Sequence, residues 1–501
     1  MATKSGYTLV DHTGRPIRSS QKRSHAPRAT FDAATTAIEN REHWAAADSL
    51  SARSANSAEV RQKLRDRSRY EAQNNPYLRA IISSLANDTI GTGPRLQLSF
   101  REFTDPDFQV RQAPPTNLAH EVEIRWQEWC DEIGLTDKLI LADKAETRDG
   151  EVFAVKRANP NLRGVKLDMQ LVEAEVCCTP DIDWSDPYAV DGMRLDNSGN
   201  VAEYHFLKRH PGDLGWFAGY SWDDYEVVPA RNVCHLFDPD RVAEYRGLPA
   251  TTATLNTYGD ARGYRKSVLH AARTHASITA VIESKDGAYT DQTIPDEHGD
   301  DDDAFDKVPL NRDTYLQMPD GKTVKFLSPT QPIPSYREVS GEFNSECGRA
   351  INNAPRNLAT GSSAEYNFAS GKLDRQGWNR GIMIRRDRRR RGLLMPFFWS
   401  WVEEGLMTPG YFPAGLPPLA SWRVRYQWDG FESIDPVKDA TAREIMLRSG
   451  QTTLDDVCAE QGKDWEEVLE QQAREKAKRK SLGLDEPGVS PAAVPAEEDM
   501  E

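Results

Sequence analysis

Apolar residues recur at the spacing of an α-helix in several parts of this chain. One helix is predicted to begin at Asn74-Asn75-Pro76 and to end at Gly91-Thr92-Gly93-Pro94, because glycine and proline terminate helices. Its apolar side consists of Leu78, Ile81, Ile82 and Leu85. A second amphipathic helix is marked by Ile124, Trp126 and Trp129. A long third helix covers about 249–283, and we expect its buried side to hold Leu255, Tyr258, Leu269, Ala272, Ala276 and Val281.

Between residues 150 and 237 the pattern changes to short runs in which apolar and polar residues alternate. The runs VFAVKRA, VKLDMQLVEAEVCC, AEYHFLKRH and YEVVPA are separated by turn signals such as Asp196-Asn197-Ser198-Gly199. Alternation with period two between turns is typical of β-strands. We therefore expect a β-rich layer here, and SWRVRYQW at 421–428 predicts one more strand. The pattern as a whole predicts an α+β fold that is mainly helical.

The segment 366–405 combines strong positive charge with aromatic residues. It holds eight arginines, and the only acids before the last of them are Asp374 and Asp387. Further on, apolar residues recur at helical spacing, which predicts a helix buried on one face: Leu394, Phe397, Phe398, Trp401 and Val402. Pro396 is expected to kink this helix, since proline removes a backbone donor. The arginines could contact a threaded anionic partner or pair with neighbouring acids, and composition alone favours the second interpretation.

The net charge, the apolar runs and the cysteine count limit the classes of partner that this chain can bind. A formal net charge of −15 over 501 residues opposes the binding of nucleic acid by the whole surface. No apolar run is long enough for a membrane-spanning helix, and the N-terminal segment lacks the apolar region of a secretory signal. The six scattered cysteines indicate reduced thiols rather than a disulfide framework or a zinc site.

Motifs for enzymatic chemistry are incomplete or missing. Gly321-Lys322-Thr323 looks like the end of a Walker A loop, but Leu316 stands where the first glycine is required. Neither H-E-x-x-H nor G-x-S-x-G occurs. The acidic run at 291–306 lacks the alternating oxygen ligands of a calcium loop, and we expect a solvated loop there. We predict no catalytic residue, no metal site and no cofactor, while a nuclease-like carboxylate cluster stays open from sequence.

Several stretches resemble, in chain order, the lambda-type family of tailed-phage portal proteins. The likeness runs from about Trp44 to Leu484. It includes LRDRSRYEAQNNPYLRAIISSLANDTIGTG, the pair Trp126 and Trp129, Asp149-Gly150-Glu151, GMRLDNSGNVAEYHFLKRHPGD, VPARNVCHLFDPDRVAEYRGLP and TTLDDVCAEQGKDWEEVLEQQAREKAKRKSLGL. The order of these stretches, rather than any single one, indicates the family.

Two further matches lie in the basic segment. Asn367-Phe368-Ala369-Ser370-Gly371-Lys372 stands where the family usually shows Asn-Tyr-Ser-Ser-x-Arg. Phe368 cannot donate the hydrogen bond of a tyrosine hydroxyl, whereas Lys372 keeps the positive charge. Trp401-Val402-Glu403-Glu404 is similar to the family's Trp-Leu-Glu-Glu.

The resemblance implies a portal fold with wing, stem, clip and crown regions in a ring, usually of twelve subunits. The regions it implies are a wing at 31–248, a stem helix at 249–285, a clip with the acidic loop at 286–335, a second stem helix at 336–355, a channel loop at 356–371, a bent basic wing helix at 372–407, and a crown of strand and helices at 408–480. From composition we expect a disordered basic segment at 1–30 and a disordered acidic tail at 481–501.

The function implied is that of a structural, non-enzymatic channel at one vertex of the capsid. Double-stranded DNA would be packaged and ejected through it without sequence specificity. The implied partners are further copies of this chain, the terminase large subunit, the major capsid protein and head-completion proteins, with no membrane contact. The protein would reside in the virion after assembly in the bacterial host's cytoplasm.

Candidate site residues all lie in the basic segment. Those nearest the implied channel loop are the candidates for DNA contact: Asn367, Lys372, Arg375 and Arg380. In an acidic ring we favour salt bridges to the next subunit for the remaining arginines: Arg385, Arg386, Arg388, Arg389, Arg390 and Arg391. Two other functions remain as alternatives. One is a DNA-processing enzyme of the packaging machinery, such as a terminase subunit or nuclease, and the other is a DNA-binding adaptor acting as monomer or dimer.

Overall fold

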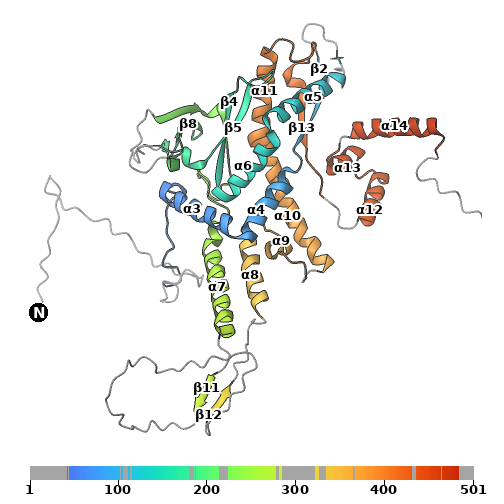
Figure 1. Cartoon of the computed structure of the whole chain (residues 1–501). Coiled ribbons are helices and arrows are strands. Elements are labelled where there is room, and N and C mark those ends of the chain that lie inside the picture. Colours follow the sequence, from blue (N-terminus) through green and yellow to red (C-terminus); the bar gives the residue numbers. More distant parts are fainter. Residues whose placement is uncertain are drawn as a thin grey trace, which may run out of the picture. The chain divides into compact units, whose positions relative to one another are not determined.

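The computed structural model of this chain describes residues 44–101, 116–179, 188–213, 224–277, 335–364, 367–431, 436–463 and 465–484, with short segments at 42, 103–104, 111–112, 186, 281–284 and 322–325. The chain divides into two compact units, residues 1–55 and 56–501. The first contains the short helix α2 (Ala52–Ala55). The second is described below and shown in Figure 1. The segments expected at 1–30, the acidic loop at 291–306 and nearly all of the tail lie outside the described residues.

The first helices of the second unit begin where the local sequence provides a cap. Ser57 caps α3 (Ala58–Asn74), and its side chain accepts a hydrogen bond from the Val60 N–H. Asn75 caps α4 (Pro76–Ile90) in the same way, at 3.1 Å from the Tyr77 N–H. The predicted start, end and buried side of this helix are confirmed. Two more helices follow, α5 (Thr116–Ile133) and α6 (Leu135–Asp149).

The expected β-rich layer is confirmed as two small antiparallel sheets. In one, β4 (Glu151–Ala158) lies between β10 (Val233–Phe237) and β5 (Leu167–Val172). The other has the strand order β6 (Ala189–Val190), β7 (Met193–Leu195), β8 (Val201–Leu207) and β9 (Tyr225–Pro229). Phe153 and Phe206 pack edge to face between the two sheets, with ring centroids 5.4 Å apart.

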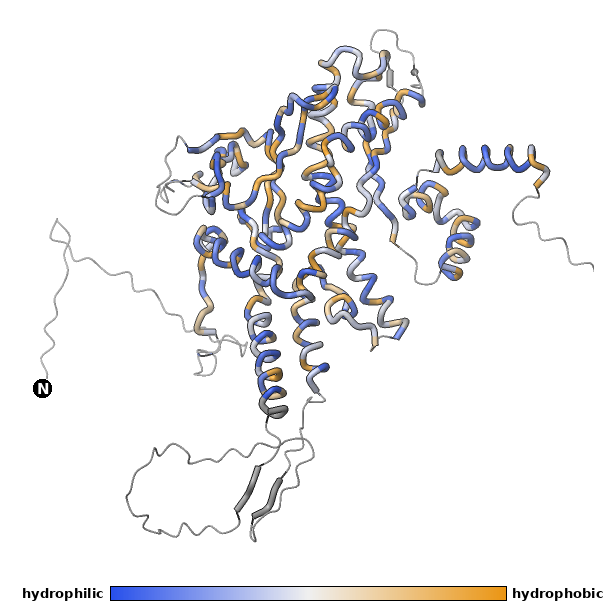
Figure 2. The backbone as a smooth tube through the Cα atoms, viewed as in Figure 1, coloured by the Kyte–Doolittle hydropathy of each residue, from blue (hydrophilic) through white to orange (hydrophobic). Residues whose placement is uncertain are grey.

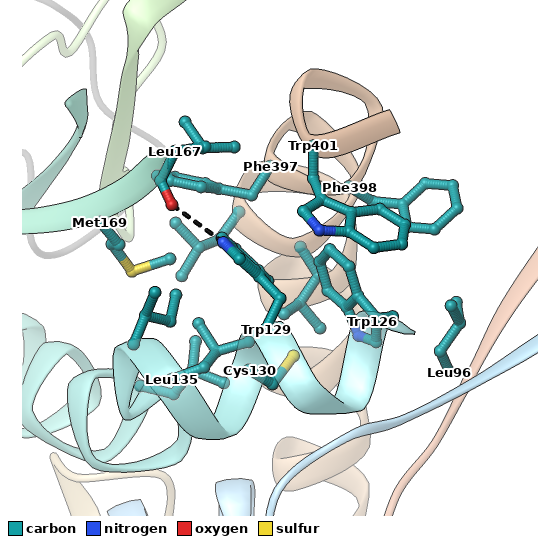
Figure 3. Packing of buried hydrophobic residues seen from close by; sticks show 14 of the residues in the cluster. Leu96, Trp126, Trp129, Cys130, Leu135, Leu167, Met169, Phe397, Phe398 and Trp401 are labelled. Atoms are coloured by element: carbon teal, nitrogen blue, oxygen red, sulfur yellow. Dashed lines mark hydrogen bonds between the residues drawn. The ribbon is translucent and has the colours of Figure 1, made fainter. Parts of the chain in front are cut away.

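The largest apolar core joins segments that lie far apart in the sequence. The predicted strand at 421–428 is β13 (Trp422–Gln427), and it pairs antiparallel with β1 (Arg95–Phe100), which the sequence pattern did not predict. Beside this ribbon, Trp126 of α5 packs against Trp401 with ring centroids 5.2 Å apart. The indole N–H of Trp129 donates to the Leu167 carbonyl at 2.9 Å, as Figure 3 shows. Trp126, Trp129 and Trp401 are therefore fixed in one cluster.

Two antiparallel helices, α7 (Leu255–Ser277) and α8 (Tyr336–Arg349), lie side by side (Figure 1). Tyr258 and Cys347 enter a core shared with α4. The helix expected to reach residue 283 ends at Ser277, and Val281 belongs to strand β11 (Val281–Ser284), paired with β12 (Lys322–Lys325). The expectation that Leu269 is buried was wrong: its side chain is 51% exposed, because no described element covers that part of α7.

The C-terminal part starts with a short helix, α9 (Arg356–Thr360), inside the segment expected to be a channel loop. The basic helix follows as α10 (Phe368–Arg389), a π-helical turn (Arg390–Leu394) and α11 (Met395–Met407). After β13 come α12 (Pro436–Arg448), α13 (Leu454–Glu460) and α14 (Trp465–Leu482), which are largely hydrophilic in Figure 2. None of the side chains of α12 is buried. Within the described residues, no helix has the length and apolarity needed to cross a bilayer.

Candidate nucleic-acid interface

Helix α10 begins with residues that expose their charges. The Asn367 side-chain oxygen caps the helix by accepting a hydrogen bond from the Ser370 N–H at 2.8 Å. Lys372, Arg375 and Arg380 follow, and all are exposed without an ion pair to any residue that the structure describes. We call these three residues the exposed set. Lys372 lies nearest the positive end of the helix dipole, and Arg375 and Arg380 continue the cationic surface along α10.

Between the exposed charges, apolar contacts hold α10 on the body of the unit. Trp378 is buried, and its indole N–H donates to Asp88 of α4 at 2.8 Å. Asn352, at the end of α8, donates from its side chain to the Trp378 carbonyl at 3.2 Å. Gly381 is required opposite Asn352, since any Cβ there would overlap the Asn352 side chain. The position of the exposed set is therefore fixed from the inner side of the helix.

One turn further, two arginines of α10 enter a buried ionic cluster with α6. Arg389, with a side chain only 2% exposed, donates to Asp143 at 2.7 Å and also pairs with Glu146. Arg385 donates to Asp143 at 3.2 Å and to the Thr147 hydroxyl at 3.0 Å. Burial alone would raise the pKa of Asp143, but the charges of the two arginines outweigh it and hold that pKa below its ordinary value.

Arg386 is satisfied by backbone rather than by acids. Its guanidinium donates to the carbonyls of Thr89 and Asp88 at the end of α4, both at 2.9 Å. It also donates to the Asp429 carbonyl at 2.8 Å and lies over the Phe431 ring. The last carbonyls of a helix lack partners within it, so a cation is well placed there. Burial lowers the pKa of Arg386, with the nearby acids acting in the opposite direction. Arg385, Arg386 and Arg389 form what we call the buried set.

The remaining arginines of the segment pair at the surface. Arg390 and Arg391 both contact Asp387, at 2.7 Å and 2.8 Å, within the same helical turn. Arg388 reaches Asp238 just after β10 at 2.6 Å. These acids belong to the same chain, which agrees with the local-pairing interpretation of the basic helix. Pairing with a neighbouring subunit stays a prediction for all six arginines from Arg385 to Arg391.

A π-helical turn lies just before Pro396, the residue at which the sequence predicts a kink. The turn covers Arg390–Leu394, and Pro396 lies in the first turn of α11. Proline cannot donate to the carbonyl four residues earlier, and the wider π turn accommodates that missing bond. Trp401 in α11 is fully buried, as predicted.

The sequence analysis did not identify the acids that hold the buried set. Asp143 and Glu146 lie on the buried side of α6, beside Leu139 and Ala142. Such carboxylates require a cationic partner when they are buried. The sequence could therefore have indicated a buried ionic cluster through these two acids, which are three residues apart within a buried stripe. The neighbouring residues in the sequence do not reveal which cations pair with them.

A second ionic cluster unites residues of three stretches that carry the family resemblance. Glu151 is buried at the start of β4, and Arg246 donates to it through Nη2 at 2.6 Å. Arg65 of α3 donates to the same carboxylate at 3.2 Å, and His235 contacts it at 3.0 Å. Burial would raise the pKa of Glu151, but Arg246 and His235 hold it well below its ordinary value. These residues hold the helices to the β-layer and offer no exposed reactive group.

One group of described side chains has the spacing of a metal site. Glu173, Glu175 and His210 bring one ligand atom each within 4.8 Å of one another. Arg69 lies 2.9 Å from Glu175 and 3.5 Å from Glu173, so both carboxylates already have a cationic partner. We assign no metal to this group. The Lys322 and Thr323 pair of the broken Walker pattern lies on strand β12.

Comparisons with known proteins give a consistent assignment. The model of the lambda family of phage portal proteins matches residues 38–386. The probable portal protein of Halomonas phage phiHAP-1 is 24% identical over 453 residues, covering 85% of this chain and 82% of the relative. The portal protein B of Escherichia phage lambda is 26% identical over 103 residues, or 19% of each chain.

Solved structures give weaker likenesses. A chain from the neck of an empty gene transfer agent particle aligns over 83% of this chain and 94% of its own length, with 12% identity and a TM-score of 0.41. A chain from the virion of the native particle covers 77% of this chain and 88% of its own, also at 12% identity, with a TM-score of 0.38. At such TM-scores the assignment rests on the sequence matches. Because the family model spans most of its length, the chain belongs to the lambda family of phage portal proteins.

Proposed function

We propose that this protein forms a ring, of twelve subunits in the simplest case, that serves as the DNA channel at one vertex of the capsid. Double-stranded DNA would enter during packaging and leave during ejection. The terminase large subunit, the major capsid protein and head-completion proteins would bind the ring, which would assemble in the host bacterium's cytoplasm. In this arrangement residues 356–371 face the channel, and 286–335 form the clip that meets the terminase.

The observation that carries this proposal is the division of basic residues along α10. The exposed set follows residues 356–371 along the chain and has no acid partner among the described residues, whereas the buried set is bound by acids and carbonyls of the same chain. Among the described basic residues of α10, the exposed set is therefore the one best placed to meet phosphates. With so few cations against a net charge of −15 per copy, DNA would be held weakly. Weak contact without base recognition suits a duplex of any sequence that must slide.

The first test is electron microscopy of the purified protein, with class averages viewed along the particle axis. Rings with a central opening are expected. Particles that stay monomeric with and without capsid and terminase partners would contradict the proposal and favour the adaptor alternative.

The second test replaces exposed charges. The double variant Lys372→Glu and Arg375→Glu is expected to form rings but to package or retain less DNA, because negative charge would face the phosphates. Glutamate is acceptable near a helix N-terminus, so folding should be unaffected. The matched control is Lys63→Glu with Arg67→Glu, two exposed basic residues of α3. Normal packaging by the first variant would remove the exposed set from the channel.

A further inference from the structure

The paired helices α7 and α8 carry charges of opposite sign on their outer faces. On α7, Lys266 and Arg273 are seven residues apart and therefore share one side of the helix. On α8, the exposed acids follow at intervals of four residues: Glu338, Glu342 and Glu346. Both helices have a mixed hydropathy pattern, with hydrophilic positions on each (Figure 2).

These faces point away from the contacts that join the two helices. Within the pair, Tyr264 stacks on Tyr336 and Arg265 donates to Asn344 at 3.0 Å. At 100° per residue, Lys266 and Arg273 lie about 160° and 180° around α7 from Tyr264, the residue that contacts α8. The same spacing places the acids of α8 opposite Cys347 and Asn344. The charged faces are therefore accessible from outside the unit.

Most of these charges lack a partner within the described part of the chain. Lys266, Arg273, Glu338 and Glu346 are exposed and form no ion pair with another described residue. Glu342 pairs with Arg356 at 2.8 Å. A cationic face and an anionic face on different sides of one unit cannot meet within a copy. They can meet between copies arranged head to tail, and such contacts close into a ring when the rotation allows it.

We propose that the cationic face of α7 docks against the anionic face of α8 in the neighbouring copy of this chain. The inference rests on the ring of the proposed function and names the surface through which the ring is joined. Gly259 and Gly263 lie on the same face of α7, and a Cβ added to either would meet no atom of this chain. Glycine within a helix costs about 1 kcal/mol relative to alanine, so close approach by an outside helix gives these residues a role.

The positions of Lys266 and Glu338 along the axes of the two helices agree with this contact. The Tyr264 ring contacts both Tyr336 and Phe343, with ring centroids 6.0 Å and 6.2 Å away. Along the helix axis, Tyr264 of α7 therefore lies beside the part of α8 midway between Tyr336 and Phe343. Lys266 lies about 3 Å further along α7, which brings it to the height of Glu338 in the antiparallel helix. Rotation about a ring axis preserves height. Lys266 of one copy therefore meets Glu338 of the next where the helices run near the axis direction.

A charge exchange tests this pairing with the full-length protein. Lys266→Glu and Glu338→Lys are each expected to raise the concentration needed for ring assembly about tenfold or more, because like charges then face each other at every contact. The variant carrying both substitutions restores opposite charges and should assemble like the unmodified protein. Ring content is measured by sedimentation velocity at low and high salt. Lys63→Glu, an equal change on α3, should have no effect.

The outcomes separate this inference from the proposed function. Rings in the unmodified protein and equally in both single variants would leave the channel in place but overturn this contact. Failure of the exchanged variant to recover, with its melting temperature unchanged, would also overturn it. Normal assembly of Lys266→Glu with reduced packaging would assign the cationic face to DNA instead. If the unmodified protein forms no ring under any condition, the proposed function and this inference both fail.

Discussion

Helix α10 carries two sets of basic residues whose surroundings differ completely. The exposed set, Lys372, Arg375 and Arg380, precedes the buried set along the helix, and no described acid pairs with it. The buried set, which ends with Arg389, is bound by α6 carboxylates and by the carbonyls that end α4. The same residue types thus serve as available charge in one part of the helix and as internal structure in another.

The difference shows what a run of arginines means in a fold. Guanidinium groups bind carboxylates and carbonyls in fixed geometry, so they can join elements as well as attract phosphates. Here Arg389 joins α10 to α6, and Arg386 joins it to α4 and to the residues after β13. The density of arginine is therefore highest where the helix is fixed, and the sparser end keeps its charges exposed.

The largest loss of stability is expected from a substitution in the aromatic core that contains Trp401. Trp401→Ala should lower the free energy of unfolding by about 3–5 kcal/mol, because it leaves a cavity among Trp126, Phe398 and Phe412. Urea denaturation measures the change, and Met407→Ala on the exposed side of α11 is the control. An unchanged transition would mean that Trp401 is not buried in solution.

Removing one cation of the buried set should cost nearly as much. Arg389→Met leaves Asp143 and Glu146 without their main partner, and a buried charge without compensation costs about 3–5 kcal/mol. Arg391→Met is the control, since that side chain is 63% exposed and pairs only at the surface. Equal, small losses in both variants would abolish the distinction between buried and surface arginines.

The cost of Arg389→Met should depend on pH. In the folded protein the pKa of Asp143 lies below its ordinary value, so its ion pair adds stability above about pH 4, the pKa of an unfolded aspartate. That contribution is lost as pH falls through the lowered folded pKa. The difference in unfolding free energy between the unmodified protein and Arg389→Met should therefore shrink as pH falls from about 7 to below about 4. A constant difference would show that charge is not the cause.

A smaller effect is expected at Trp378, which lies between Arg375 and Arg380 of the exposed set. Trp378→Phe keeps the buried ring but removes the N–H that donates to Asp88, and should cost about 1–2 kcal/mol. Asp88→Asn keeps an oxygen acceptor and serves as the matched change. Hydrogen exchange along α10 would show whether its start detaches from α4. A loss comparable to that of Trp401→Ala would indicate a packing defect rather than a missing hydrogen bond.

The sequence predicted most of what depends on neighbours along the chain. The caps and apolar side of α4, the strand β13, the burial of Trp401 and the irregularity beside Pro396 all follow from local pattern. Local pattern did not place β1, whose partner strand follows more than 300 residues later. Pairing across such a distance leaves no periodic signal in either segment.

The site was predicted less completely than the fold. The sequence located the basic helix and its exposed beginning, but it treated Arg385, Arg386 and Arg389 as surface charges available to another subunit. Whether an arginine is buried depends on what lies opposite, and Asp143 is 246 residues away from Arg389. Leu269 shows the opposite error, since its apolar side chain fits a buried stripe that no element of the described chain covers.

The smallest change in stability is expected for the exposed set itself. Replacing Lys372, Arg375 and Arg380 together with alanine should change the unfolding free energy by no more than about 0.5 kcal/mol, since these side chains form no described ion pair and are exposed. DNA packaging should fall nevertheless, and more strongly at low salt, where phosphate attraction is least screened. Lys63→Ala with Arg67→Ala controls for lost positive charge elsewhere. A stability loss above about 1 kcal/mol would place the exposed set in the fold rather than in the channel, and would remove the contrast from which the DNA-facing role is inferred.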